Sequence, residues 1–198
     1  MTCFLKILII RLAGAGRREM LFVPWRYIAD WKCVMCGLCC KAYSVVLSFQ
    51  EWLNIVKNYG VETTATGLNK LYLRRKSDGS CVFLYRLPNM HLCGLQHMKP
   101  TACKLWPFKV LTAPKYGYAR DAAYPYLGKI LYVYADSMCT GLQYGTPTWS
   151  FTNQTLKEFI EIALGTRREQ IKSTADMGLT QQLLTPLGGS FKTWLLML

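Results

Sequence analysis

The pattern of apolar residues predicts a strand that runs directly into a helix in the first third of the chain. Residues 43–49 are rich in β-branched and aromatic side chains, which favours a strand. Residues 51–59 carry apolar side chains at helical spacing, and Gly60 follows as the stop signal. We therefore expect a strand–helix unit that ends at Gly60.

Short apolar runs separated by turn residues follow this unit. Such runs predict short strands, and close connections between them favour antiparallel pairing. The segments are residues 68–75, 80–87, 107–112, 116–122 and 129–134. We expect them to form a small antiparallel sheet.

The C-terminal part predicts one amphipathic helix that covers the sheet. Thr155 and Glu158 fit a capping box, and the apolar positions continue at helical spacing to about Lys172, although Gly165 weakens the middle. The last twenty residues read as a loop and an apolar end, which docks on the core or on a partner. The expected fold class is α+β: a small metal-stabilised domain with short antiparallel strands, a few helices and this C-terminal helix.

Length and hydrophobic content bound the domain organisation. A chain of 198 residues with 52% hydrophobic residues has enough apolar surface for one domain with a core. We expect a cysteine-cluster domain over residues 25–145, with the helix and apolar tail of residues 146–198 packed on it. Residues 1–24 form a basic and apolar extension, either disordered or lying in a membrane interface, and Met20 is an alternative start.

The same N-terminal extension carries no convincing export signal. Its apolar stretch, residues 3–13, is interrupted by Lys6 and Arg11 and is much shorter than the roughly 20 residues that span a bilayer. We therefore expect a cytoplasmic protein without a transmembrane segment. In the cytosol, clustered cysteines serve metals or catalysis more often than disulfides.

Basic residues are concentrated in the middle of the chain. The formal net charge is +13, and residues 63–120 contain ten Lys and Arg but a single acid, Asp78. This excess predicts an acidic partner, either nucleic acid or an acidic protein, with a lipid headgroup as another anionic candidate. Two four-thiolate sites that each hold a divalent metal would offset about four of these charges, so metal binding explains only part of the excess.

The densest chemical signal is a run of four cysteines, Cys33, Cys36, Cys39 and Cys40. Thiolates bind zinc or iron when several sulfurs converge on one centre, and a Cys-x-x-Cys turn supplies two from one bend. Gly37 suits that bend because glycine takes a positive φ. The first three cysteines match the spacing of a bacterial ferredoxin run, which favours an iron–sulfur cluster. Since Cys40 directly follows Cys39, we expect the doublet to divide its ligands between centres.

Four further cysteines extend this inventory: Cys81, Cys93, Cys103 and Cys139. Pro100 and Thr101 predict the start of a helical turn that presents Cys103. His97 is either a ligand, a neighbour of the ligands or a polar residue at the edge of the site, and His91 is a weaker candidate. Cys3 lies outside the pattern. The alternative, in which some thiols are merely buried or disulfide-bonded, stays open, most of all for Cys40.

These motifs resemble the cysteine-cluster proteins of the YkgJ type, described as a zinc- or iron-chelating domain. The resemblance covers about residues 25–145 and rests on Cys33-x-x-Cys36-Gly37-x-Cys39-Cys40, Gly79-Ser80-Cys81-Val82-Phe83-Leu84, Cys93, Lys99-Pro100, Cys103, Trp106-Pro107-Phe108 and Cys139. It implies an iron–sulfur cluster or Zn²⁺ held by the eight cysteines. Lys99 and Lys104 stand where the family usually has arginine, and lysine lacks the guanidinium fork that captures anions bidentately.

The flagellin lysine N-methylases are similar in cysteine pattern, which implies methyl transfer from S-adenosylmethionine. No nucleotide-binding glycine loop, catalytic triad or carboxylate pair in the sequence supports an enzyme independently. Three functions therefore remain: a metal-binding protein that is redox-active or carries a cluster, a lysine methyltransferase, and a zinc-stabilised module that binds nucleic acid or an acidic partner. The first is favoured, with an iron–sulfur cluster ahead of zinc.

Overall fold

The computed structural model describes residues 21–95 and 98–172. The described residues form several helices and short antiparallel strands grouped in small sheets, so the predicted α+β class is confirmed. None of the described helices has the length and apolar character that crossing a membrane requires. The predicted N-terminal extension up to residue 20 and the apolar C-terminal end lie outside the described residues.

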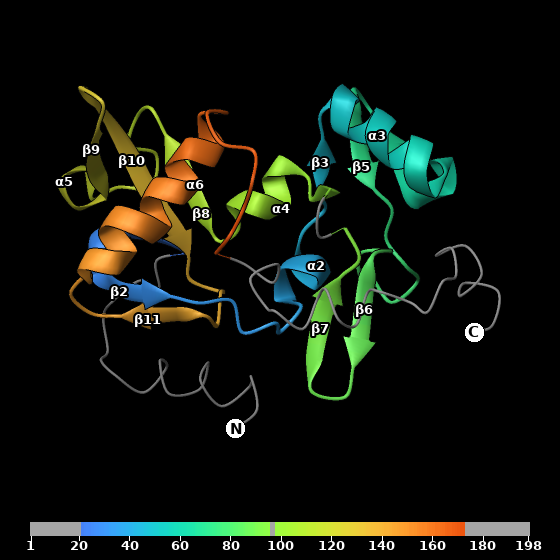
Figure 1. Cartoon of the computed structure of the whole chain (residues 1–198), viewed down its shortest axis with the longest axis horizontal. Helices are drawn as coiled ribbons and strands as arrows, with labels where there is room; N and C mark the ends of the chain where they lie inside the picture. Colours follow the sequence, from blue (N-terminus) through green and yellow to red (C-terminus); the bar gives the residue numbers. More distant parts are fainter. Residues whose placement is uncertain (1–20, 96–97, 173–198) are drawn as a thin grey trace.

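A central antiparallel sheet is built around the longest strand, β10 (Lys129–Asp136). Its neighbours are β1 (Phe22–Pro24), β8 (Phe108–Leu111) and β9 (Ala123–Tyr126). The helix α6 (Leu156–Ala163) covers this sheet (Figure 1). Side chains from both layers share the first core cluster, which includes Phe108, Val133, Leu156, Phe159 and Ile160.

Beside this sheet, β2 (Ile28–Trp31) pairs with β11 (Leu142–Tyr144). The short helix η1 (Trp25–Tyr27) connects β1 to β2, and the helix α5 (Ala119–Ala122) precedes β9. Trp25, Ile28, Trp31 and Leu142 belong to the same core cluster, so this pair of strands and the central sheet enclose one apolar interior.

A second core cluster lies under α3 (Phe49–Tyr59). Its strands are β3 (Val46–Leu47), β5 (Lys70–Leu73) and β4 (Thr64–Gly67), with η2 (Val61–Thr63) leading into β4. The hairpin of β6 (Leu84–Leu87) and β7 (Met90–Cys93) follows. The cluster contains Leu47, Ile55, Leu73, Cys81, Phe83 and Leu95.

Two short helices lie between these two regions (Figure 1). They are α2 (Leu38–Ala42) and α4 (Thr101–Leu105), and α4 contacts both α6 and β3. Each of the two carries predicted metal ligands, so the cysteines are concentrated where the two cores meet.

Several predicted elements are confirmed in position. The helix of residues 51–59 is α3, and it ends at Gly60, whose φ is +88°. The structure adds a capping box at its start, where the Ser48 hydroxyl accepts from the Glu51 N–H and the Glu51 carboxylate accepts from the Ser48 N–H. The predicted strand at 43–49 is reduced to Val46–Leu47, and the run at 80–87 forms a strand only in its last four residues.

The predicted strand at 116–122 is wrong. Gly117 and Tyr118 both have positive φ, +80° and +47°, which breaks an extended backbone, and α5 follows. The bend is held because the buried Tyr134 donates its hydroxyl to the Gly117 carbonyl oxygen at 2.7 Å. An aromatic, strand-like composition is therefore overruled here by a tertiary contact.

The predicted capping box at Thr155 is also wrong. Thr155 has helical dihedrals and ends a π-helical segment, η4 (Phe151–Thr155), that continues into α6. Glu158 is buried and accepts from the backbone N–H groups of Ile171 and Lys172 at 2.8 and 2.9 Å. The helix stops at Ala163 rather than at Lys172, because Gly165 turns the chain at φ +73°.

Candidate metal centre

All eight predicted ligands line one cavity of about 540 Å³. Every one of them is a free thiol in this structure. The members come from loops, two helices and a hairpin: Cys33, Cys36, Cys39, Cys40, Cys81, Cys93, Cys103 and Cys139. Segments more than a hundred residues apart in sequence, such as those of Cys33 and Cys139, therefore present sulfur to the same space.

The first cysteine loop is shaped by two left-handed residues. Met35 has φ +52° and Gly37 has φ +69°, so the chain turns sharply on each side of Cys36. The predicted positive φ of Gly37 is confirmed. A Cβ on Gly37 would lie 2.8 Å from the ring of His91, and the His91 N–H donates to the Met35 carbonyl at 2.9 Å. The loop is thus pressed against β7.

The remaining cysteines are brought in by main-chain pairing and by α4. The Cys81 N–H donates to the Cys40 carbonyl at 2.8 Å, and the Leu84 N–H donates to the Cys81 carbonyl at 3.0 Å. Leu84 is in turn the register partner of Cys93 in the hairpin. Cys103 lies on α4, the helical turn predicted to start after Pro100.

Cys139 follows β10 and returns to the first loop. Its sulfur accepts a hydrogen bond from the Trp31 indole N–H at 3.4 Å. Burial raises the pKa of Cys139 to about 11; the Trp31 N–H lowers it, and the charges of Cys36 and Cys33 raise it further. A bound cation would offset that burial cost, because metal binding favours the thiolate.

The two thiols of the doublet shift each other's pKa in opposite directions. The sulfurs of Cys39 and Cys40 lie 3.9 Å apart. The hydrogen bond from Cys40, assisted by Lys99, lowers the pKa of Cys39 to about 7. The same contact, together with burial, raises the pKa of Cys40. The lowered pKa of Cys39 favours its thiolate, which is the form that binds a metal.

Lys99 lies beside the thiols, a place that the sequence did not reveal. It is buried, with 8% of its surface exposed, and it lines the cavity. Its charge lowers the pKa of Cys33, Cys39, Cys93 and Cys103 against the effect of burial. A buried lysine among thiols favours a negatively charged site. In the sequence, the one indication that Lys99 lies near the thiols was its position between Cys93 and Cys103.

The thiols surround the cavity without meeting at one point. Within residues 21–95 and 98–172, no three Cys, His, Asp or Glu side chains are already arranged to hold a metal ion. The donor set nevertheless fits a thiophilic metal, because eight free thiols, a buried cation and an indole donor share one space. Side-chain rotation of the cysteines would have to close a coordination shell.

The other candidate ligands have different positions. His91 lines the cavity but accepts a hydrogen bond from the Lys41 ammonium at 3.2 Å. Burial, then the charges of Lys41 and Arg86, lower its pKa, so the ring is neutral. His97 and Cys3 lie outside the described residues.

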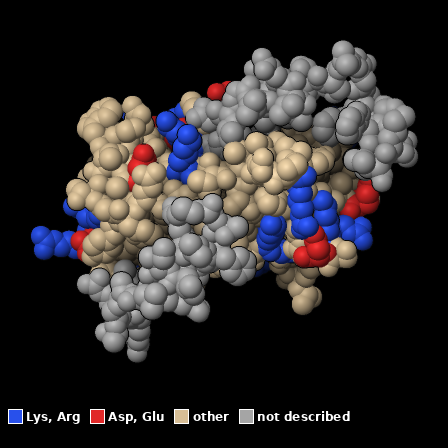
Figure 2. Space-filling model, turned by 90° about the horizontal axis from the view of Figure 1, so that it is seen from below, with Lys and Arg blue, Asp and Glu red and all other residues tan. Residues whose placement is uncertain are grey.

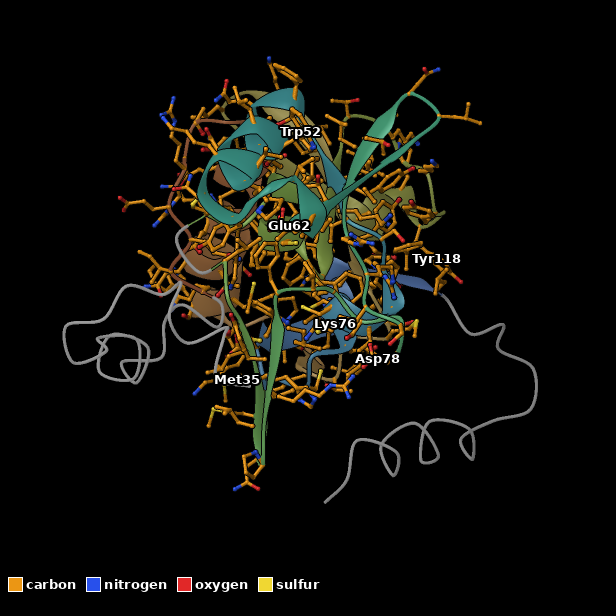
Figure 3. All side chains as sticks on the ribbon, turned by 90° about the vertical axis from the view of Figure 1, so that its right-hand side faces the viewer. Met35, Trp52, Glu62, Lys76, Asp78 and Tyr118 are labelled. Carbon is orange, nitrogen blue, oxygen red and sulfur yellow. The ribbon has the colours of Figure 1, made fainter. Side chains whose placement is uncertain are left out.

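Many of the basic residues predicted to face an acidic partner serve the fold. Lys76 donates to the Leu84 carbonyl at 2.9 Å, and Arg75 donates to the Tyr43 carbonyl at 2.6 Å. Arg86 pairs with Asp78, which lies close to Lys76 in Figure 3. Figure 2 shows Lys and Arg in small separate groups on the face it presents, with acidic side chains beside several of them. Part of the excess of basic residues is therefore explained by hydrogen bonds and an ion pair within the fold.

Together, the α+β fold and the cavity lined by eight thiols define a small cysteine-rich metal-binding domain. The family model CxxCxxCC, described as "Putative zinc- or iron-chelating domain", matches residues 32–139. This match covers more than half of the chain and spans all eight cysteines. The chain belongs to this family, as its cysteine pattern predicted, and general metal binding is supported. Comparison with curated proteins found no match, and neither did comparison with solved structures.

Proposed function

We propose that this protein holds an iron–sulfur cluster, zinc, or one of each through its eight cysteines, and that it acts in electron transfer or as a cluster carrier. The observation that carries this proposal is the gathering of all eight thiols around one cavity. Cysteines that served only as small apolar core residues would have no reason to share it. The family description supports a zinc or iron ligand set.

An iron–sulfur cluster is the favoured occupant. The spacing of Cys33, Cys36 and Cys39 matches the first three ligands of a ferredoxin-type run. Apolar side chains such as Leu73, Leu84 and Leu95 line the same cavity, and an apolar surround tunes the potential of a cluster. Seven of the eight cysteines are only partly buried, which leaves a short path for electrons or for cluster transfer to a partner.

The test is metal analysis of the full chain purified without oxygen. We expect iron and acid-labile sulfide, together with visible absorption that dithionite bleaches. Zinc alone would support metal binding but overturn the cluster and the redox role. A protein that contains neither iron nor zinc, and whose eight cysteines all react as free thiols, would overturn the proposal as a whole.

The other two functions stay predictions with separate readouts. A lysine methyltransferase should bind S-adenosylmethionine in isothermal titration calorimetry. A module for nucleic acid should bind RNA or DNA with an affinity that falls steeply as salt increases. Since several of the basic residues already have partners within the fold, we expect the metal readout to be the strongest of the three.

A further inference from the structure

The eight thiols fall into two sets by the core against which they pack. Cys33 and Cys139 pack against the first core cluster, with Trp31 and Phe108. The other set belongs to the second cluster, where Cys81 is a buried member and Cys40 and Cys93 pack against it. The two cores lie on opposite sides of α2 and α4 (Figure 1).

Main-chain contacts repeat this division. Beside the first core, the Lys32 N–H donates to the Gly141 carbonyl at 3.2 Å. Lys32 directly precedes Cys33 and Gly141 lies two residues after Cys139, so this bond brings the two cysteine segments together. The approach is so close that a Cβ on Gly141 would lie 2.1 Å from the Lys32 carbonyl oxygen. Beside the second core, the hydrogen bond from Cys81 to Cys40 joins the doublet to the hairpin. Each set is thus held by its own backbone pairing.

Two more cysteines are placed by the segments that carry them. Cys36 lies one Cys-x-x-Cys turn after Cys33, which assigns it to the first set. Cys103 lies on α4, whose first residue Thr101 donates its N–H to Glu51 of α3 and which also contacts β3, so it is assigned to the second. Three thiols then belong to the first set and four to the second, apart from Cys39.

The doublet lies at the border between the two sets. Cys40 packs against the second core cluster and its carbonyl accepts the N–H of Cys81, so it faces the second core. Cys39 belongs to neither core cluster of the described residues, and its sulfur lies 3.9 Å from that of Cys40. Structural thiolate sites take four ligands, and the second set already has four. Cys39 therefore completes the first set, in keeping with its two-residue spacing from Cys36.

We propose that the chain builds two adjacent four-thiolate metal centres that meet at the Cys39–Cys40 doublet. One consists of Cys33, Cys36, Cys39 and Cys139, and the other of Cys40, Cys81, Cys93 and Cys103. Each takes a thiophilic metal ion, Zn²⁺ or Fe²⁺, or an iron–sulfur cluster. This inference rests on the proposed metal-binding function and adds which thiols act together.

The experiment counts metal ions on paired variants. The full chain is reduced, freed of metal with a chelator and titrated with Zn²⁺, and its stoichiometry is read by native mass spectrometry. We expect two equivalents for the unchanged chain and for the control Cys3→Ser. The within-set double variant Cys33→Ser/Cys139→Ser should keep one equivalent, and so should Cys81→Ser/Cys93→Ser. The cross-set double variant Cys139→Ser/Cys93→Ser should keep none.

The doublet is tested in the same way. Cys39→Ser added to Cys139→Ser should still leave one equivalent, because both belong to one centre. Cys40→Ser added to Cys139→Ser should leave none, because it damages both. Equal stoichiometry for these two double variants, or for the within-set and cross-set pairs, would overturn the division. One equivalent on the unchanged chain would overturn it too, while leaving metal binding intact. No Zn²⁺ equivalent, together with no iron in the chain purified without oxygen, would overturn the proposed function itself.

A second measurement avoids variants that fail to fold. Zn²⁺ is withdrawn stepwise from the unchanged chain by a competing chelator, and exposed thiols are alkylated and located by tandem mass spectrometry. We expect four cysteines to become reactive together, followed by the other four, in the sets given above. Alkylation of all eight in a single step, or in sets of other membership, would contradict two separate centres.

Discussion

The backbone N–H of Cys81 donates a 2.8 Å hydrogen bond to the carbonyl oxygen of Cys40. This bond connects the end of the first cysteine run to the start of the second cysteine group. The bond also holds Cys81 beside the other thiols of the cavity. No single turn of the chain could do so, because Cys81 is far in sequence from every other cysteine. The metal centre is therefore assembled by long-range pairing, and its supporting contacts are open to test.

Trp31→Phe should weaken metal binding while keeping the ring packing. The substitution removes the indole N–H that donates to the Cys139 sulfur, and the loss of such a supporting donor lowers metal affinity by about tenfold. Competition with a chromophoric chelator measures it. The matched control is Trp52→Phe, which removes the donor to Thr64 at 3.2 Å and should leave the affinity unchanged. Equal affinities in the two variants would show that the Trp31 contact is irrelevant to the metal.

Gly37→Ala should destabilise the protein more than its backbone strain alone requires. A left-handed φ costs a non-glycine residue about 1–2 kcal/mol, and here the new methyl group also meets the His91 ring. Gly117→Ala is the control, because its φ is also positive while nothing lies within 4 Å of its Cβ position. Urea unfolding gives both free energies. Because the His91 Cβ would also lie 2.9 Å from the new methyl group, His91→Gly should remove the excess cost of Gly37→Ala. If Gly37→Ala costs no more than Gly117→Ala, the close approach to His91 does not affect stability.

Lys99→Met should reduce metal affinity by about tenfold or more. A divalent metal with four thiolates carries a net charge of −2, and a buried ammonium beside it contributes a favourable interaction of roughly 1–4 kcal/mol. Lys99→Arg keeps the charge and should retain most of the affinity. Lys104→Met is the control, since that ammonium donates to the Arg168 carbonyl instead. A similar loss in Lys99→Arg and Lys99→Met would mean that shape, not charge, matters.

Glu51→Gln should destabilise the protein at neutral pH by about 1–2 kcal/mol. The Glu51 carboxylate accepts from Thr101 at the start of α4 and from Ser48 at the start of α3, so it ties the helix that bears Cys103 to its neighbour. Burial raises the pKa of Glu51, but hydrogen bonds from Thr101 and Ser48 outweigh it, and the net pKa is below the ordinary 4.5.

The sign of this shift sets the pH dependence. Because the folded pKa is lowered, the stabilisation by Glu51 is fully present above pH 4.5 and is lost as the pH falls through the folded pKa. Urea unfolding at pH 7 and at lower pH should show the gap between the unchanged chain and Glu51→Gln closing in acid. Metal release affects both chains alike, so the difference isolates the carboxylate. The exposed Glu62→Gln should show no such gap, and a gap that stays constant with pH would refute this assignment.

Local features were predictable because they depend on neighbours along the chain. The apolar spacing and Gly60 predicted α3, and Pro100 predicted the turn that presents Cys103. The segment at 116–122 failed for the opposite reason, since the hydrogen bond from Tyr134 to the Gly117 carbonyl outweighs the strand propensity of its aromatic residues. The predicted capping box at Thr155 was wrong for the same reason, since the Glu158 carboxylate accepts from the N–H groups of Ile171 and Lys172 instead of capping the helix.

The sequence alone established the α+β class, the metal-binding family and the candidate ligand set, because side-chain chemistry and short spacings are properties of the chain itself. Only the tertiary structure decided which thiols are neighbours and that Lys99 lies buried among them. Those relations depend on contacts between distant segments, such as Lys32 with Gly141 and Cys40 with Cys81. Burial and hydrogen bonding in the folded state stabilise such pairing, so the spacing of residues along the chain does not predict which segments pair.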